Sequence, residues 1–146
     1  EKERVETLLS KKGRLNYADI RYELQVAMAK KVGVFRKEDE LKEAVDTVRR
    51  LKSLYREIGL RNKSRIFNFE LINTLELEGM LDLAEIITKG AVLRTESRGS
   101  HFRRDYPKRD DERWLKHTIA RLTESGPSFE YSKVKITRYE PKERKY

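Results

Sequence analysis

The chain of 146 residues contains no cysteine, three prolines and one tryptophan. Without cysteine it can form neither a disulfide nor a thiolate metal site. Its two histidines, His101 and His117, are too far apart for a local zinc motif. No apolar run reaches the ~20 residues of a membrane-spanning helix, and the start, Glu1 to Arg4, does not resemble a signal peptide. These absences predict a soluble, intracellular domain without a resident metal.

Glycine is also sparse, and the seven glycines stand singly along the chain. A dinucleotide-binding fold needs a glycine-rich turn between a strand and a helix, so that backbone N–H groups can approach the pyrophosphate. No segment of the sequence provides such a turn. We therefore expect no flavin or nucleotide to be bound by these residues alone.

Charge, by contrast, is abundant: 40% of the residues are charged, and the net charge is +9. A basic excess suggests a helical module that binds RNA or DNA, and this alternative stays open. However, acidic and basic residues alternate almost everywhere, so no stripe of one sign forms, and we expect no nucleic-acid partner. The same mixture is typical of thermophile proteins rich in ion pairs, which predicts a thermophilic source.

Helical periodicity dominates the first two thirds of the chain. Apolar residues spaced by three and four predict helices over about Tyr17–Lys31, capped by Asn16, and over about Glu38–Ile58. Gly59 is expected to close the second helix in the left-handed conformation. Lys37 cannot accept a capping hydrogen bond, so we expect a frayed start to this helix. A short peripheral helix is expected before these two.

The third expected helix, over about Asn68–Arg94, is the most apolar segment. We expect it to be central and buried by the other two helices. Gly79 and Gly90 lower its helix propensity, which suggests the close approach of another backbone. The predicted fold is mainly α, with a three-helix antiparallel bundle (spectrin-repeat-like) over residues 1–94.

The last third of the chain loses this period. Residues 95–116 predict an irregular arm that ends in a turn of helix over Asp111–Lys116. Residues 117–146 predict a small β-hairpin and a tail, with a turn at Gly126–Pro127 and a bulge or break near Ser132 and Lys133. We take the three parts together as a single domain.

The arm carries motifs of unusual density: Glu96 to His101, Asp105 to Pro107, Arg109 to Asp111 and Trp114 to Thr118. Together they resemble the C-terminal domain of the flavoprotein subunit of succinate dehydrogenase and fumarate reductase. The resemblance extends to further segments, so it covers nearly the whole chain. These segments are Val32 to Arg36, Phe67–Asn68, Leu75 to Leu77, Ile136 to Tyr139 and Pro141 to Tyr146.

The resemblance implies a parent enzyme that oxidises succinate to fumarate through FAD and passes electrons to an iron–sulfur subunit and quinone. It implies that FAD and the dicarboxylate are held by FAD-binding and capping domains, both missing here. The chain is then an inactive fragment that packs on those domains and meets the iron–sulfur subunit. It would lie in the cytoplasm, on the inner face of the cell membrane only through the assembled complex. L-aspartate oxidase and adenylylsulfate reductase are the alternatives within related families, and the direction of catalysis stays open.

The arm's acids, bases and imidazole could be a catalytic cluster, but an irregular arm also needs such side chains to satisfy its backbone. We favour the second interpretation and expect no catalytic residue here. Trp114 could form a stacking platform with Tyr106, Phe102 and Tyr131, although packing over the end of the bundle is the simpler role. We expect both histidines to be hydrogen-bonded and partly buried. The expected interdomain or structural residues are Arg94, Glu96, Ser97, Arg98, Gly99, His101, Arg103, Asp105, Pro107, Asp110, Asp111, Trp114 and His117.

Overall fold

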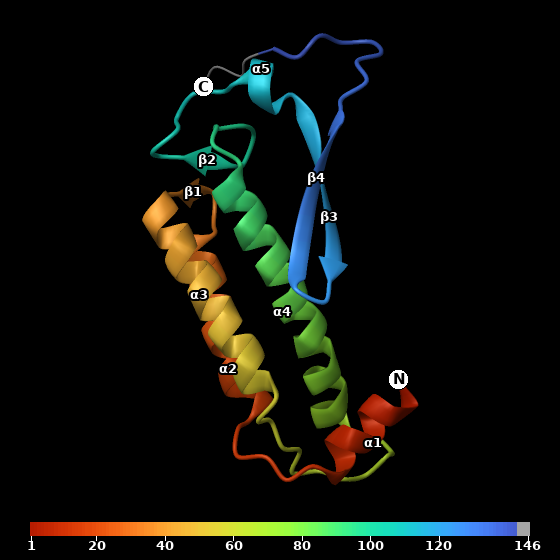
Figure 1. Cartoon of the computed structure of the whole chain (residues 1–146). Helices are drawn as coiled ribbons and strands as arrows, with labels where there is room; N and C mark the ends of the chain where they lie inside the picture. Colours follow the sequence, from red (N-terminus) through yellow and green to blue (C-terminus); the bar gives the residue numbers. More distant parts are fainter. Residues whose placement is uncertain (143–146) are drawn as a thin grey trace.

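The computed structural model describes residues 1–142, so the last four positions of the family-like segment Pro141 to Tyr146 lie outside the described residues. Three long helices run side by side, a short helix crosses one end, and a hairpin lies along the other half of the longest helix (Figure 1). Within residues 1–142, no helix is both long and apolar enough to cross a membrane. The elements are α1 (Lys2–Ser10), α2 (Tyr17–Lys31), β1 (Phe35–Arg36), α3 (Glu38–Tyr55), α4 (Phe69–Leu93), β2 (Phe102–Arg103), α5 (Asp111–Trp114), β3 (Lys116–Thr123) and β4 (Gly126–Lys133).

The mainly α fold and its helices are confirmed. Helix α2 has the predicted bounds, and the Asn16 side chain accepts a hydrogen bond from the N–H of Ala18. Helix α4 begins after Asn68, whose side-chain oxygen accepts from the N–H of Leu71 at 2.9 Å. These side chains satisfy N–H groups that have no partner within the helix.

The predicted end of α3 was wrong. The helix stops at Tyr55, and Gly59 does not adopt the left-handed conformation. Instead Gly59 lies against Gly13, and a Cβ on Gly59 would come within 2.2 Å of the Gly13 nitrogen. A close crossing of two chain segments, rather than a helix cap, therefore explains this glycine.

The core lies between α2, α3 and α4. Leucine and valine side chains from all three helices are almost completely buried there, and each contributes roughly 1.5–3 kcal/mol by leaving water. The main cluster consists of Ile20, Leu24, Val48, Leu51, Ile58, Leu77, Leu81 and Ala84. The short helix α1 closes a smaller cluster of Leu9, Leu60 and Leu71.

Helix α4 is central only on one side, so the expectation that it is buried by the other two helices was partly wrong. Ile72, Leu83 and Ile87 are exposed. The two glycines of this helix also differ from expectation. The neighbour of Gly90 is the Phe129 ring of the hairpin at 3.4 Å, and Gly79 has no described neighbour within 4 Å of an added Cβ. No backbone approaches either glycine from the described residues.

The hairpin is confirmed, but its details differ. Strands β3 and β4 pair without a bulge from Thr123 opposite Gly126 to Lys116 opposite Lys133. The turn residues are Glu124 and Ser125, and Gly126 opens β4 with a φ of 104°. A second pairing was not predicted: β1 and β2 form a two-residue parallel bridge, which ties the arm to the start of α3.

Candidate functional site: the arm at the end of helix α4

Arg103 fixes the arm to the last turn of α4. Its side chain is 0% exposed, although it carries a charge. Nη1 donates to the carbonyl oxygens of Ala91, Val92 and Arg94 at 3.0, 3.1 and 3.3 Å. These carbonyls have no partner within the helix, and they lie at the negative end of its dipole. The buried guanidinium of Arg103, which follows α4 in the sequence, therefore caps the C-terminal end of this helix.

The other edge of this guanidinium holds Asp105. Nε and Nη2 of Arg103 donate to the two carboxylate oxygens at 2.8 and 2.7 Å. This pairing holds the pKa of Asp105 at about 2. The same carboxylate accepts from the backbone N–H of Glu38 at 3.1 Å. Asp105 thus caps the start of α3 in place of Lys37, which makes no side-chain cap.

His101 joins the arm to both neighbouring segments. Nη1 of Arg36 lies 2.5 Å from Nδ1, and the carbonyl oxygen of Arg94 lies 3.1 Å from Nε2. A guanidinium only donates and a carbonyl only accepts, so Nδ1 carries the lone pair and Nε2 the proton. Burial lowers the pKa of His101 below its usual value, although the hydrogen bond to the Arg94 carbonyl opposes this effect. The ring is therefore a neutral bridge whose two nitrogens are both engaged.

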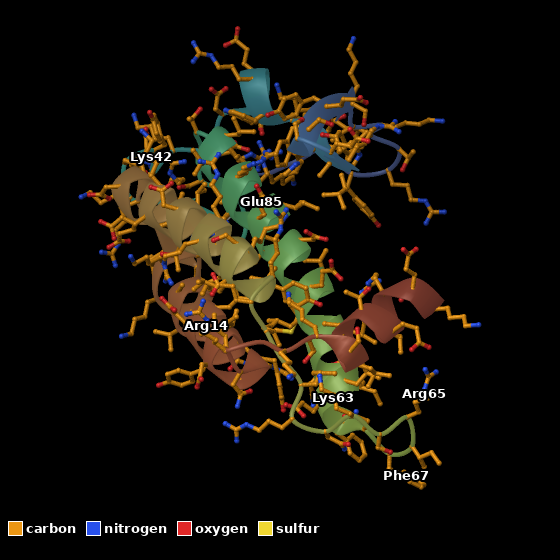
Figure 2. All side chains as sticks on the ribbon, turned by 60° about the horizontal axis from the view of Figure 1, so that its bottom comes forward. Arg14, Lys42, Lys63, Arg65, Phe67 and Glu85 are labelled. Carbon is orange, nitrogen blue, oxygen red and sulfur yellow. The ribbon has the colours of Figure 1, made fainter. Side chains whose placement is uncertain are left out.

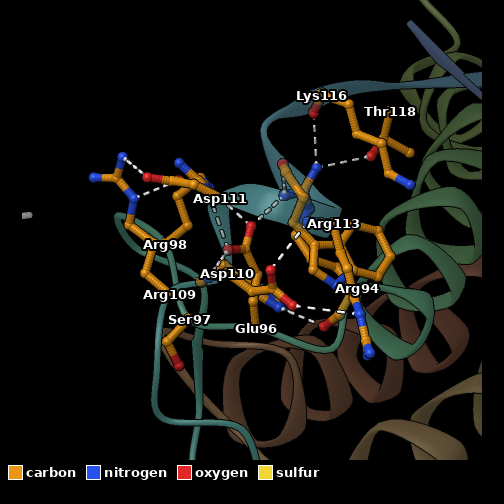
Figure 3. A network of polar contacts seen from close by, with 12 residues as sticks. Arg94, Glu96, Ser97, Arg98, Arg109, Asp110, Asp111, Arg113, Lys116 and Thr118 are labelled. Atoms are coloured by element: carbon orange, nitrogen blue, oxygen red, sulfur yellow. Dashed lines mark hydrogen bonds and ion pairs between the residues drawn. The ribbon is translucent and has the colours of Figure 1, made fainter. Parts of the chain in front are cut away.

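Glu96 is the centre of a second network, in which its carboxylate is 0% exposed (Figure 3). Its partners are Nη1 of Arg94 at 2.6 Å, Nε and Nη2 of Arg98 at 2.8 and 3.1 Å, and the N–H of Asp110 at 2.9 Å. Burial raises the pKa of Glu96, but these hydrogen bonds outweigh it, and the pKa falls below its usual value. Glu96 is thus a buried, ionised and fully bonded carboxylate.

Arg94 carries this network on to the hairpin. Besides Glu96, it donates to the carbonyls of Trp114 and Lys116 and to the hydroxyl of Thr118, each at 3.1 Å (Figure 3). The Trp114 side chain is buried and meets the Tyr131 ring edge to face at 5.7 Å. One arginine at the end of α4 therefore sets the place of α5 and of the start of β3.

The outer part of the arm is held by Asp111, Asp110 and Ser97. Hydrogen bonds from Arg109 and Arg98 hold the pKa of Asp111 at about 2. The Asp110 carboxylate caps α5 by accepting from the N–H of Arg113 at 3.0 Å. Ser97 Oγ accepts from the N–H of Arg103 and donates to the carbonyl of Tyr106, both at 2.8 Å.

The remaining expected residues take no part in these networks. Gly99 has a φ of 56°, which allows the tight turn between Arg98 and His101, and Pro107 is exposed. The expectation that His117 is partly buried was wrong: it is exposed on β3, because it falls on the outward side of the hairpin. Pro107 and His117 thus lie at the surface of the domain.

The four aromatic residues of the alternative stacking platform do not gather around Trp114 as a unit. Phe102 meets Phe35 edge to face with ring centroids 5.5 Å apart, and the Tyr106 ring lies under the Arg103 guanidinium at 4.9 Å. Only Tyr131 joins Trp114.

The sequence did not predict that Arg36 contacts His101 or that Glu38 contacts Asp105. Single charged residues of this kind carry no signal in the sequence. Arg36 alone belonged to a segment with family resemblance.

These contacts hold segments distant in sequence in one arrangement. The carboxylates of Glu96, Asp105 and Asp111 and both nitrogens of His101 are occupied by partners within the chain. Among residues 1–142, no buried side-chain nitrogen or oxygen lacks a partner, and no cluster could hold a metal ion. The arrangement is suited to rigidity rather than to proton transfer.

A family model described as the fumarate reductase flavoprotein C-terminal region matches residues 21–146. The chain belongs to this family. The fumarate reductase flavoprotein subunit of Haemophilus influenzae is 40% identical over 98% of the chain, which covers 24% of that subunit. The succinate dehydrogenase flavoprotein subunit of Rickettsia bellii is 35% identical over 92% of the chain, or 23% of that subunit. The chain thus spans about a quarter of the length of these relatives.

Solved structures agree with the family. A mutant of E. coli quinol fumarate reductase matches with a TM-score of 0.92 and 34% identity, over 97% of this chain and 25% of that one. Adenylylsulfate reductase from Archaeoglobus fulgidus matches with a TM-score of 0.75 at 21% identity, over 86% and 20% of the two chains, so it shares the fold alone. The family consists of flavoprotein oxidoreductases that use FAD, and its fold is the helical C-terminal domain described above.

Proposed function

We propose that the chain is the C-terminal structural domain of a flavoprotein that interconverts succinate and fumarate, inactive alone. It packs on the FAD-binding and capping domains and holds their relative geometry. The observation that carries this proposal is the internal pairing of the arm. Because Glu96, Arg103 and His101 are fully bonded within the chain, they stabilise a shape and leave no free acid or base.

The residues present do not fit a flavin site. In the arm, the one backbone turn with a glycine at positive φ is at Gly99, and the side-chain donors of Arg98 and His101 beside it are engaged by Glu96 and the Arg94 carbonyl. A pyrophosphate needs several free N–H groups in a glycine-rich turn. FAD in the parent is therefore assigned to the domains outside this chain. The dicarboxylate is assigned there too.

Family membership supports the remaining partners that we propose. In the parent, electrons pass from FAD to an iron–sulfur subunit and on to quinone, as in a respiratory step of the tricarboxylic acid cycle. This domain offers surface to the iron–sulfur subunit. It meets the membrane only through the assembled complex, on the cytoplasmic side.

A thermophilic source is a further part of the proposal. Ion pairs link separate elements, as between Arg4 of α1 and Glu78 of α4 and between Lys52 of α3 and Asp82 of α4. Such networks contribute more at high temperature, where the cost of desolvating charges falls. A melting midpoint above the ordinary mesophile range of about 45–65 °C supports this source, and one within that range contradicts it.

Complementation tests the proposed function. The FAD-binding and capping portion of the parent flavoprotein is expressed with and without this chain, and dye reduction is followed with succinate and, in parallel, with L-aspartate. Succinate-dependent reduction that requires the chain supports the proposal. If only aspartate is oxidised, the parent belongs to the related L-aspartate oxidases. If the two parts do not associate, the interdomain role is wrong, and salt-dependent binding of DNA or RNA becomes the next test.

A further inference from the structure

The outer face of α4 is apolar and uncovered in the described chain. Its positions follow one another at spacings of three and four, so they share one side of the helix. The large side chains on it are strongly exposed: Phe69 70%, Ile72 49%, Leu83 60% and Ile87 49%. Single exposed apolar residues are ordinary, but a row of them along one face marks an interaction surface.

Charge is almost missing from this face. Charged residues make up 40% of the chain, but this row has one charged member, Glu76. The row consists of Phe69, Ile72, Glu76, Gly79, Leu83 and Ile87. The other sides of α4 carry Asp82, Glu85 and Lys89, which pair with one another or with Lys52. Apolar, charge-poor surfaces are typical of permanent interfaces rather than of transient ones.

Gly79 lies in the middle of the same row. A glycine inside a helix is less favourable than alanine. Nothing among residues 1–142 lies within 4 Å of a Cβ built there, and its φ is not positive. Neither packing nor backbone conformation in this chain therefore requires glycine at position 79. On this face Gly79 follows Glu76 and precedes Leu83, and its missing side chain leaves a notch into which another backbone fits.

The loop before α4 extends this surface. Phe67 is 89% exposed and has a φ of 50°, a left-handed conformation that is costly for an aromatic residue. Figure 2 shows it at the outer edge of the molecule. The loop is nevertheless held firmly, because the Asn68 side chain donates to the carbonyls of Asn62 and Ser64 at 2.9 and 2.8 Å. A strained, exposed and well-anchored aromatic side chain is suited to a partner's pocket.

We infer that the outer face of α4, with Gly79 as its notch, is the surface on which the FAD-binding portion of the same flavoprotein packs. This inference rests on the proposed function. The occupant follows from chain length, since the relatives are about four times as long as this chain. An apolar face of this extent on one quarter of a protein is covered by the remainder of that protein.

The test measures association of the purified chain with the FAD-binding and capping portion of the parent, by analytical ultracentrifugation. The variant is Gly79→Leu, which fills the notch. The matched control is Gln25→Leu, which adds the same side chain to an exposed position of α2. Gly79→Leu is expected to leave the melting temperature of the isolated chain unchanged or higher, because the site is open. Its dissociation constant from the FAD-binding portion is expected to rise at least about tenfold, and that of Gln25→Leu to stay unchanged.

The outcomes separate the two proposals. If the wild-type chain associates and Gly79→Leu binds as tightly, the inference is wrong and the proposed function stands. If the wild-type chain does not associate at all, the proposed function is wrong, and the inference goes with it. If Gly79→Leu dissociates a homodimer of this chain and leaves the complex with the FAD-binding portion intact, the face belongs to a second copy, and the inference is again wrong.

Discussion

Helix α4 meets two very different environments in this chain. At its C-terminal end, Arg103 and His101 engage the last carbonyls, and the arm is closed by pairs within the chain. Along its outer face, Leu83 is exposed, and no described atom lies within 4 Å of a Cβ built on Gly79. Substitution at the closed end should therefore destabilise the isolated domain, and substitution on the open face should act on assembly. The predictions below test this division.

The largest effect is expected for Arg103→Ala. It leaves the carbonyls at the end of α4 and the Asp105 carboxylate without their shared partner, and removing one member of a buried ion pair costs about 3–5 kcal/mol. Urea denaturation of the isolated chain measures this loss. Arg104→Ala is the control, because Arg104 is exposed and lies over the Phe35 ring at 5.6 Å, a contact of at most about 1 kcal/mol. Equal midpoints for the two variants contradict the capping role.

As the pH falls, the contacts of the arm with the end of α4 are expected to be lost before the helical core unfolds. The pKa of Asp105 is lowered from 3.8 to about 2, chiefly by its hydrogen bond with Arg103. A lowered carboxyl pKa gives stability that is complete above pH ~4 and is lost as the pH falls towards 2. We expect Asp105→Asn to have lower stability at neutral pH and a smaller further loss over this range. Urea midpoints between pH 5 and 2 measure it, and parallel curves for variant and wild type argue against the assignment.

These two residues also show the limits of sequence reasoning. The helices could be predicted because apolar spacing and caps such as Asn16 are local signals. That Arg103 would cap α4 could not be predicted, since one arginine in a charged arm looks like its neighbours and the partner carbonyls are in the preceding helix. The β1–β2 bridge was missed for a related reason, because two-residue strands have no periodicity.

The outer face of α4 was misread for a different reason. An apolar helix is interpreted as central when the sequence is assumed to hold all of its neighbours. Leu83 and Ile87 are exposed here, because no other described element covers this side of α4. Gly79, whose added Cβ would meet no described atom within 4 Å, is the local feature on which the inferred contact with a partner rests.

The open face should respond in the opposite direction. Gly79→Ala is expected to stabilise the isolated chain by about 1 kcal/mol, because alanine favours the helix and the added methyl group meets no described atom within 4 Å. Thermal unfolding measures the gain. In contrast, Gly59→Ala places a Cβ 2.2 Å from the Gly13 backbone and should lower the melting temperature. If Gly79→Ala lowers it as well, the face is not open.

The smallest effect is expected at His101. Burial lowers its pKa, so below about pH 6.5 the unfolded chain binds a proton that the folded chain resists. Stability is therefore complete above pH ~6.5 and falls as the pH drops below it. His101→Gln, which cannot take up this proton, should flatten the stability curve between pH 7 and 5. An unchanged slope would show that the ring titrates freely.

The division between the closed end and the open face is tested most directly by thiol accessibility, because the chain has no cysteine of its own. Leu83→Cys reports on the outer face of α4, and Asp46→Cys reports on the exposed side of α3. Labelling rates, read by mass on this chain, are compared with and without the FAD-binding portion of the parent. We predict that Leu83→Cys reacts rapidly in the isolated chain and slowly in the complex, whereas Asp46→Cys reacts alike in both. Equal rates for Leu83→Cys in the two states would contradict the account.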